Sequence, residues 1–198
     1  MNSLIDEAFN IGMLQQYEEI SALVELMRAH APKNVMEIGS CHGGTFFLWC
    51  KLASADGLKI SLDLPNGRFG ANDYIDSEAL AERIALFQSW AENVHVLSGD
   101  SHQAETKEQI RRILDGELLD FLFIDGDHEY KGVKLDFDMY REFVRPSGLI
   151  GFHDIRNTEH HRLNSCFVHE FWKELPCPKQ EIIDPLGYWG GIGVATNA

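Results

Sequence analysis

The feature that most constrains this chain is an apolar run that ends at a cluster of acids and a histidine. Residues 121–124 are Phe, Leu, Phe and Ile, a pattern typical of a strand buried on both faces. Asp125, Asp127, His128 and Glu129 follow directly. Ligands of an open parallel sheet bind outside the carboxyl ends of its strands, so a functional site is predicted here. A plain loop, with one of the aspartates capping the next helix, is the alternative.

A glycine-bearing turn lies earlier in the chain. Residues 35–38 form a short apolar strand pattern that passes through Gly39 and Gly43 into the apolar residues 46–49. Glycines let backbone N–H groups approach a ligand at a helix N-terminus. The spacing is not the dinucleotide pattern G-x-G-x-x-G, and Glu37 fits poorly beside a pyrophosphate. An ammonium group or a hydroxyl donor fits better, and a purely structural turn is the alternative.

Other predicted strands also end in polar residues. Asp63 closes a strand at 58–63, roughly 20 residues after the glycine turn, where nucleotide-binding folds place a carboxylate on ribose hydroxyls. Two further strands, at 94–97 and 149–152, are followed by Gly99, Asp100 and Ser101 and by His153 and Asp154. If the strands at 121–124 and 149–152 are neighbours, the last pair lies beside Asp125.

Amphipathic helices alternate with these strands. The first has apolar residues at helical spacing from Met13 to Met27 and ends near Ala31, because Pro32 cannot continue the hydrogen-bond ladder. Such a helix covers a sheet edge, closes a site or supports a dimer, and the sequence leaves these roles open. Similar patterns predict helices around 80–91, 110–114, 133–144 and 167–175, and strands around 181–183 and 188–195.

The alternation predicts a three-layer α/β domain with a mostly parallel sheet. At 198 residues and 44% hydrophobic content, the chain suits one compact domain. We expect a single domain over residues 1–198, with residues 1–31 as an N-terminal helical cover and residues 33–198 as the core.

Composition narrows the partners and the compartment. Asp and Glu outnumber Lys and Arg by 31 to 17, and the formal charge of −14 disfavours nonspecific binding to nucleic acid or anionic membrane. No stretch approaches the roughly 20 apolar residues of a membrane span, and no basic leader opens the chain. We therefore expect a cytoplasmic protein with a small-molecule or protein partner. The cysteines have no C-x-x-C spacing and indicate neither a zinc knuckle nor a disulfide framework: Cys41, Cys50, Cys166 and Cys177.

Taken together, the ordered motifs resemble those of a class I S-adenosylmethionine (SAM)-dependent methyltransferase. They are residues 35–45, Asp63, residues 99–101, residues 123–128 and residues 146–154. The closer resemblance is to small-molecule O-methyltransferases related to the catechol and macrolide-sugar enzymes, a group that includes proteins labelled cephalosporin hydroxylase. It covers residues 33–155 and implies a Rossmann-like three-layer sandwich whose seven-stranded sheet has the order 3-2-1-4-5-7-6, with the last strand antiparallel.

The resemblance also implies a cofactor site. Around the methionine part of SAM it places Glu37, Gly39, Ser40, Gly43 and Thr45. It places Asp63 on the ribose hydroxyls, and beside the adenine it places Gly99, Asp100 and Ser101.

Catalytic roles follow from the same resemblance. Asp125 would lie beside the cofactor and bind a divalent metal together with His153 and Asp154, and His128 would be the general base. A base of near-neutral pKa suits deprotonation of an acceptor hydroxyl, and Mg²⁺ would orient that hydroxyl. Relatives usually have an acid where His153 stands, so the preference is expected to shift toward Mn²⁺, Fe²⁺ or Zn²⁺, or metal binding to be lost.

Plainer structural roles are the alternatives for these residues. In that case His153 and Asp154 form a hydrogen-bonded pair that shapes the pocket, and His128 begins a helix. The remaining histidines outside the motifs are expected on the surface: His160, His161 and His169.

The resulting functional hypothesis is SAM-dependent methylation of a small-molecule hydroxyl. An NAD(P)-dependent oxidoreductase and a non-catalytic nucleoside-binding protein are the alternatives. The acceptor is left open, because its specificity would come from the N-terminal helix, the loop at 66–73 and the region after Asp154. The oligomeric state is also open, with a homo-oligomer among the alternatives.

Overall fold

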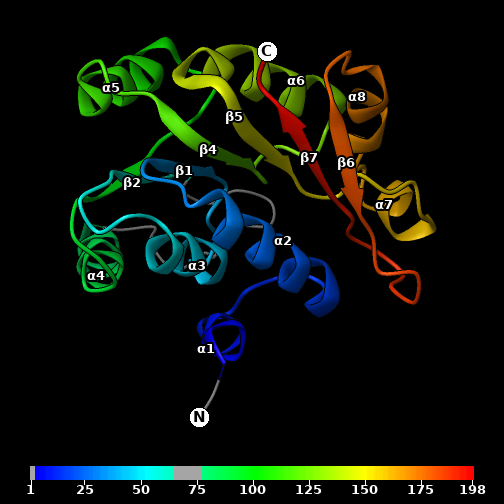
Figure 1. Ribbon diagram of the computed structural model, residues 1–198, viewed down its shortest axis with the longest axis horizontal. Coiled ribbons are helices and arrows are strands. Elements are labelled where there is room, and N and C mark those ends of the chain that lie inside the picture. The colour runs from blue at the N-terminus through cyan, green and yellow to red at the C-terminus, as the bar shows by residue number, and fades with distance from the viewer. Residues whose placement is uncertain (1–2, 65–76) are drawn as a thin grey trace.

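The protein is described by a computed structural model over residues 3–64 and 77–198 (Figure 1). The loop expected at 66–73 lies outside these described residues. The helices are α1 (Leu4–Ile11), α2 (Tyr17–His30), α3 (Gly44–Leu52), α4 (Ser77–Gln88), α5 (Ala104–Leu114), α6 (Tyr130–Tyr140), α7 (Glu159–Leu163) and α8 (Val168–Glu174). The strands are β1 (Val35–Ile38), β2 (Lys59–Asp63), β3 (Val94–Ser98), β4 (Leu119–Ile124), β5 (Val144–Phe152), β6 (Lys179–Ile182) and β7 (Ile192–Thr196).

The strands form one seven-stranded sheet in the order β3-β2-β1-β4-β5-β7-β6. The pairs among β3, β2, β1, β4 and β5 are parallel, whereas β7 runs antiparallel to both β5 and β6. Ile124 is in register with Ile38 of β1 and with Phe152 of β5. The carboxyl ends of β1, β4 and β5 therefore lie level with one another, and the predicted sheet order is confirmed.

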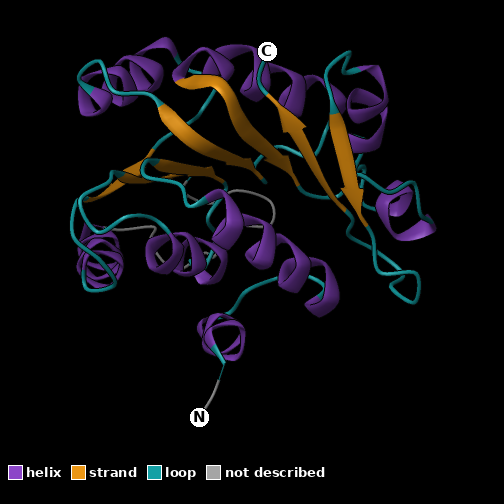
Figure 2. Ribbon diagram, viewed as in Figure 1, coloured by secondary structure: helices purple, strands orange, loops and turns teal. Residues whose placement is uncertain are grey.

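Helices cover both faces of the sheet (Figure 2). Figure 1 shows α5, α6 and α8 on one side and α2, α3 and α4 on the other, with α1 beyond them. The central strand β4 explains why two layers are needed, because its alternate side chains enter different hydrophobic clusters. Leu122 and Ile124 pack in the cluster under α5, α6 and α8, and Phe121 and Phe123 pack in the cluster under α2 and α3.

Two segments near the chain ends differ from the predictions. The first predicted helix begins at Tyr17 rather than Met13, and it is preceded by α1, which a capping box between Ser3 and Asp6 starts. The predicted strand at 188–195 begins only at Ile192, because positive φ angles at two glycines, 82° at Gly190 and 91° at Gly191, interrupt extended backbone. The residues before these glycines therefore form a loop.

All four cysteines are free, as predicted. Where Gly44 begins α3, an added Cβ would lie 2.5 Å from the carbonyl oxygen of Ala8, so α1 packs tightly on the core. Within residues 3–64 and 77–198, no helix combines the length and the apolar character that crossing a membrane requires. Asp127 accepts a hydrogen bond from the backbone N–H of Glu129. Glu129 is itself the N-cap of α6, so Asp127 does not cap this helix.

Candidate active site

The ends of β4 and β5 bring four of the predicted site residues together. Asp125 directly follows β4, and its N–H donates to the carbonyl of Ile38 at 2.8 Å, which holds it against the turn after β1. His153 and Asp154 follow β5. Asp154 has a φ of 61°, an uncommon left-handed conformation for a residue other than glycine. Backbone strain of this kind often accompanies functional sites.

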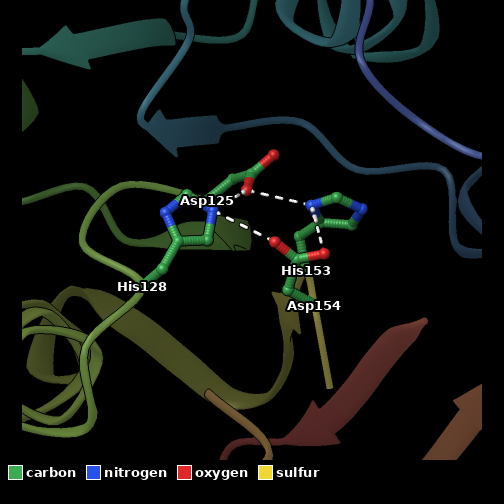
Figure 3. Close-up of side chains that lie close together, drawn as sticks. All are labelled: Asp125, His128, His153 and Asp154. Carbon is green, nitrogen blue, oxygen red and sulfur yellow. Dashed lines mark hydrogen bonds and ion pairs between the residues drawn. The ribbon is translucent and has the colours of Figure 1, made fainter. Parts of the chain in front are cut away.

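The four side chains form a compact cluster (Figure 3). His128 Nε2 lies 3.4 Å from Asp125 Oδ1 and 3.2 Å from Asp154 Oδ2. His153 Nδ1 lies 3.1 Å from Asp125 Oδ1 and 3.6 Å from Asp154 Oδ1. Two imidazoles thus alternate with two carboxylates, all on the rim formed by the ends of neighbouring strands.

The carboxylates control the protonation of both histidines. Burial lowers the pKa of His128, but hydrogen bonds and negative charges from Asp125 and Asp154 outweigh it and raise that pKa to about 10. Burial also lowers the pKa of His153, but the negative charges of Asp125 and Asp154 and the hydrogen bond to Asp125 outweigh it and raise that pKa to about 9. Without a bound cation, both imidazoles are therefore protonated at neutral pH.

The histidines in turn keep the carboxyl groups ionised. Burial raises the pKa of Asp125, but the charge of His153 and hydrogen bonds from His128 and His153 outweigh it, and the net shift is downward. The same balance, with His161 as an additional donor, holds the pKa of Asp154 well below its ordinary value. Two imidazolium and two carboxylate charges balance, so a divalent cation that displaced two protons would leave the net charge unchanged.

The cluster fits a metal ion by its donors and their spacing. One donor atom from each of the four residues lies within 4.8 Å of all the others. Two ligands that are each about 2.0–2.2 Å from one cation stand about 3.0–3.5 Å apart. The four nitrogen–oxygen separations in the cluster, with both oxygens of Asp154 counted, run from 3.1 to 3.6 Å. The three predicted metal ligands, Asp125, His153 and Asp154, offer one imidazole nitrogen and two carboxylate oxygens, and the nitrogen favours Mn²⁺, Fe²⁺ or Zn²⁺ over Mg²⁺.

A second group of candidate metal ligands, Asp154, His161 and Cys166, also lies within 4.8 Å. Here His161 Nε2 donates to Asp154 Oδ1 at 3.0 Å, so a hydrogen and not a lone pair of this nitrogen faces the carboxylate. Burial, with the charge of Asp154, raises the pKa of the Cys166 thiol to about 12. These residues support Asp154 by hydrogen bonding.

Two residues around the cluster have roles that the sequence did not indicate. Gln15 Nε2 donates to Asp125 Oδ2 at 2.9 Å, from a loop 110 positions away. His161 Nε2 lies 3.0 Å from Asp154 Oδ1. The prediction that His161 is on the surface is wrong, because it is 1% exposed and its ring is held between Asp154 and Thr158. The same prediction is wrong for His169, which lies in α8 and is 4% exposed.

A cavity of about 480 Å³ lies beside the cluster, within the ~300–1,000 Å³ usual for small-molecule sites. Its walls contain most of the predicted cofactor residues: Gly39, Asp63, Gly99, Asp100, Ser101 and Asp125. Asp63 accepts from the N–H of Leu64 at 2.9 Å and from Arg83 Nη2 at 3.1 Å.

Two predicted cofactor residues, Glu37 and Gly43, are not among the residues that line this cavity. Glu37 is 1% exposed and lines neither cavity described here. Burial, with the charges of Asp125 and Asp63, raises its pKa well above the usual value. Gly43 also lines neither cavity. It has a φ of 92°, and an added Cβ would lie 2.2 Å from the ring of Phe87.

A second cavity of about 330 Å³ adjoins the first. The two cavities share Gly39, Cys41, Asp125, His128 and Asn164. The second is lined by Ser40 and Thr45 from the glycine turn and by His153 and Asp154, and its outer wall consists of Met13, Leu14, Gln15, His160, His161, Tyr188 and Trp189. The N-terminal segment and the chain after β5 therefore build one side of the site.

The loop that contributes Trp189 is held firmly. Glu19 of α2 is fully buried, and its two carboxylate oxygens accept from the N–H groups of Asp184, at 2.9 Å, and Gly191, at 2.7 Å. Arg156 donates to the carbonyl of Gly187 at 2.6 Å, inside the same loop. The ring of Trp189 meets His153 edge to face, with centroids 5.6 Å apart. These contacts hold the wall of the second cavity in place.

Comparison with solved structures places this fold among methyltransferases. An O-methyltransferase from Bacillus cereus in complex with SAH matches with a TM-score of 0.64 and 17% identity, over 99% of this chain and 91% of that one. The O-methyltransferase TomG from Streptomyces achromogenes, in complex with SAM, matches with a TM-score of 0.65 and 15% identity, over 100% and 91%. Cofactor-bound Rv0187 from MTB matches with a TM-score of 0.68 and 16% identity, over 100% and 90%. At these identities the likeness establishes the fold.

The family follows from the sequence itself. A model of a family described as a methyltransferase domain matches residues 36–155, more than half of the chain. The chain belongs to this family, and the resemblance to methyltransferases is confirmed.

Among curated proteins, the uncharacterized protein y4gI of Sinorhizobium fredii is 25% identical over 172 residues, which is 85% of this chain and 18% of that protein. A second relative, R132 of Acanthamoeba polyphaga mimivirus, is 46% identical over 39 residues, 20% of this chain and 18% of the relative. The match thus spans about a fifth of the length of each curated relative.

We predict that Glu19→Ala destabilises the protein by about 2–4 kcal/mol, because two backbone N–H groups lose their buried acceptor. Urea unfolding followed by circular dichroism measures the change. Glu18→Ala, at an exposed position of the same helix, is the control and should have little effect. An equal loss in the two variants would contradict the anchoring role of Glu19.

Proposed function

We propose that the protein is a SAM-dependent methyltransferase that methylates a hydroxyl of a small molecule. The observation that supports this most strongly is the meeting of two cavities at Asp125 and His128. Methyl transfer requires a donor and an acceptor held on opposite sides of one reacting carbon, with a base beside the acceptor. Two adjoining cavities that share a carboxylate and an imidazole suit this requirement.

The larger cavity would hold the cofactor. Asp63 would accept from the ribose hydroxyls, and Gly99, Asp100 and Ser101 would flank the adenine. Around the methionine part we place Gly39, which lines both cavities, and Ser40 and Thr45, which line the smaller cavity next to it. Glu37 and Gly43 would act from behind the turn, by shaping its backbone. SAM or SAH is named as the bound ligand in two of the similar structures, which favours the same cofactor here.

The smaller cavity would hold the acceptor. Its outer wall has the apolar side chains of Met13 and Leu14 and the aromatic rings of Tyr188 and Trp189. Among the described residues that line it, none is Lys or Arg. This favours an uncharged small molecule with an apolar face over a phosphorylated or acidic one.

In this proposal His128 is the general base. The acceptor oxygen forms a bond to the methyl carbon of SAM as the carbon–sulfur bond breaks, and the sulfonium becomes the thioether of S-adenosylhomocysteine (SAH). The hydroxyl proton passes to Nε2 of His128, which faces the cluster. Asp125, His153 and Asp154 would hold a divalent cation, whose Lewis acidity would lower the pKa of the acceptor hydroxyl and whose charge would compensate both carboxylates in place of the His128 proton. His128 would then be free of the proton that these carboxylates otherwise hold on it.

Cofactor choice separates this function from the oxidoreductase alternative. We expect SAH to raise the melting temperature of the protein, and NAD and NADP to leave it unchanged. Asp63→Asn should weaken SAH binding by about 5–150-fold, because the ribose hydroxyls lose a charged acceptor. Calorimetric titration measures this, with Asp138→Asn, on the exposed side of α6, as the control. Stabilisation by NAD but not by SAH would overturn the proposed function.

The role of His128 is tested by turnover. In an assay of radiolabelled methyl transfer from SAM to a panel of uncharged hydroxyl compounds, His128→Ala should reduce the rate by about 10²–10⁴-fold without weakening SAH binding. His95→Ala, in β3, serves as the control. Equal rates in His128→Ala and the unmodified protein would remove His128 from the reaction.

Metal binding should depend steeply on pH. Because the pKa values of His153 and His128 are raised to about 9 and about 10, both imidazoles are protonated at neutral pH and must lose protons to a cation. The affinity for Mn²⁺ should therefore rise with pH, by up to about 100-fold per pH unit below these pKa values. Titrations followed by electron paramagnetic resonance (EPR) at about pH 6, 7 and 8 measure it. Constant affinity over this range would contradict the described protonation of the cluster.

A further inference from the structure

We propose that Gln15 is a positioning residue for the cation site. Its side-chain amide holds one oxygen of Asp125, so that the other oxygen faces the remaining metal ligands. The inference rests on the metal-assisted form of the proposed function. It assigns an active-site role to the N-terminal segment, which lies outside the residues matched by the family model.

The two oxygens of Asp125 have separate partners. Oδ1 lies 3.1 Å from His153 Nδ1 and 3.4 Å from His128 Nε2, inside the cluster. Oδ2 accepts from Gln15 Nε2 at 2.9 Å. A carboxylate can rotate about its bond to Cβ, and the amide on Oδ2 stabilises the rotation that points Oδ1 at the cation position. Outer hydrogen-bond partners orient metal ligands in this way.

Chemistry also fixes the orientation of the Gln15 amide. An ionised carboxylate only accepts hydrogen bonds, so the nitrogen of the amide must face Asp125 and the oxygen must face away. Gln15 is 6% exposed, and among the described residues its Oε1 has no hydrogen-bond partner. Gln15 also lines the acceptor cavity. A buried amide whose oxygen has no hydrogen-bond partner costs stability, so its presence calls for an explanation. The hydrogen bond from its nitrogen to Asp125 supplies one.

A hydrogen-bonded turn after α1 places Gln15 next to Asp125. Gly12 ends α1 with a φ of 113°, and its N–H donates to the carbonyl of Phe9 at 3.0 Å. The N–H of Met13 donates to the carbonyl of Ala8 at 3.1 Å. An added Cβ at Gly44 would lie 2.6 Å from the nitrogen of Met13, so this turn is packed directly on the start of α3. The position of Gln15 is therefore fixed by the fold and not by its contact with Asp125 alone.

The test compares Mn²⁺ affinity in the unmodified protein and in Gln15→Met, which keeps the length of the side chain but removes the amide. We expect Mn²⁺ binding, followed by EPR, to weaken by about 10–100-fold. SAH affinity, measured by calorimetry, should be unchanged because Gln15 is not among the residues that line the larger cavity. Gln180→Met, on the exposed face of β6, is the matched control and should bind both as the unmodified protein does.

The outcomes separate this inference from the proposed function. Equal Mn²⁺ affinity in Gln15→Met and the unmodified protein would overturn the inference and leave the function intact. Equal losses of Mn²⁺ and SAH affinity would also overturn it, since they would indicate a general structural role. If the unmodified protein binds SAH but not Mn²⁺, the inference and the metal part of the function both fail. If Gln15→Met does not fold, Gln15→Asn, whose amide is one methylene too short to reach Asp125, is judged by the same outcomes.

Discussion

The structure of the site depends on the mutual charge compensation of Asp125 and Asp154 with His128 and His153. Neither pair is stable alone at this depth, because an uncompensated buried charge is costly. The carboxylates keep the imidazoles protonated, and the imidazoles keep the carboxyl groups ionised. The register of β4 and β5 supplies the alignment, since Ile124 and Phe152 are level and the charged residues follow both strands. The packing of the sheet between two helical layers thus sets the spacing of the cluster.

Much of this was predictable from local sequence patterns. Buried strands that end in polar residues identified β1, β2, β4 and β5, and the parallel sheet brings Asp125, His153 and Asp154 together for topological reasons. The contribution of Gln15 was not predictable, because a single glutamine in a loop has no pattern and its partner is 110 positions away. His161 was misjudged for a related reason, since its short helix lacks a clear apolar face and its burial comes from the loop around Gly190.

The site is formed partly by residues that the family model matches and partly by residues outside that match. The family model covers residues 36–155, which supply the larger cavity and the charged cluster, apart from Asn164 and Ser165. The outer wall of the smaller cavity comes from residues on both sides of that range. Glu19 connects these two parts physically, because α2 holds the loop that contains Trp189. In the proposed function, the matched residues would bind the cofactor and the residues on both sides of them would form the acceptor wall.

The central claim is that cofactor, cation and base meet at Asp125. A crystal structure of the protein with SAH and Mn²⁺, with the metal located by anomalous scattering, tests it most directly. We expect the adenosine of SAH beside Asp63, its sulfur at the junction of the two cavities, and Mn²⁺ bound by Asp125, His153 and Asp154. Mn²⁺ found elsewhere, or SAH bound outside the larger cavity, would contradict the account.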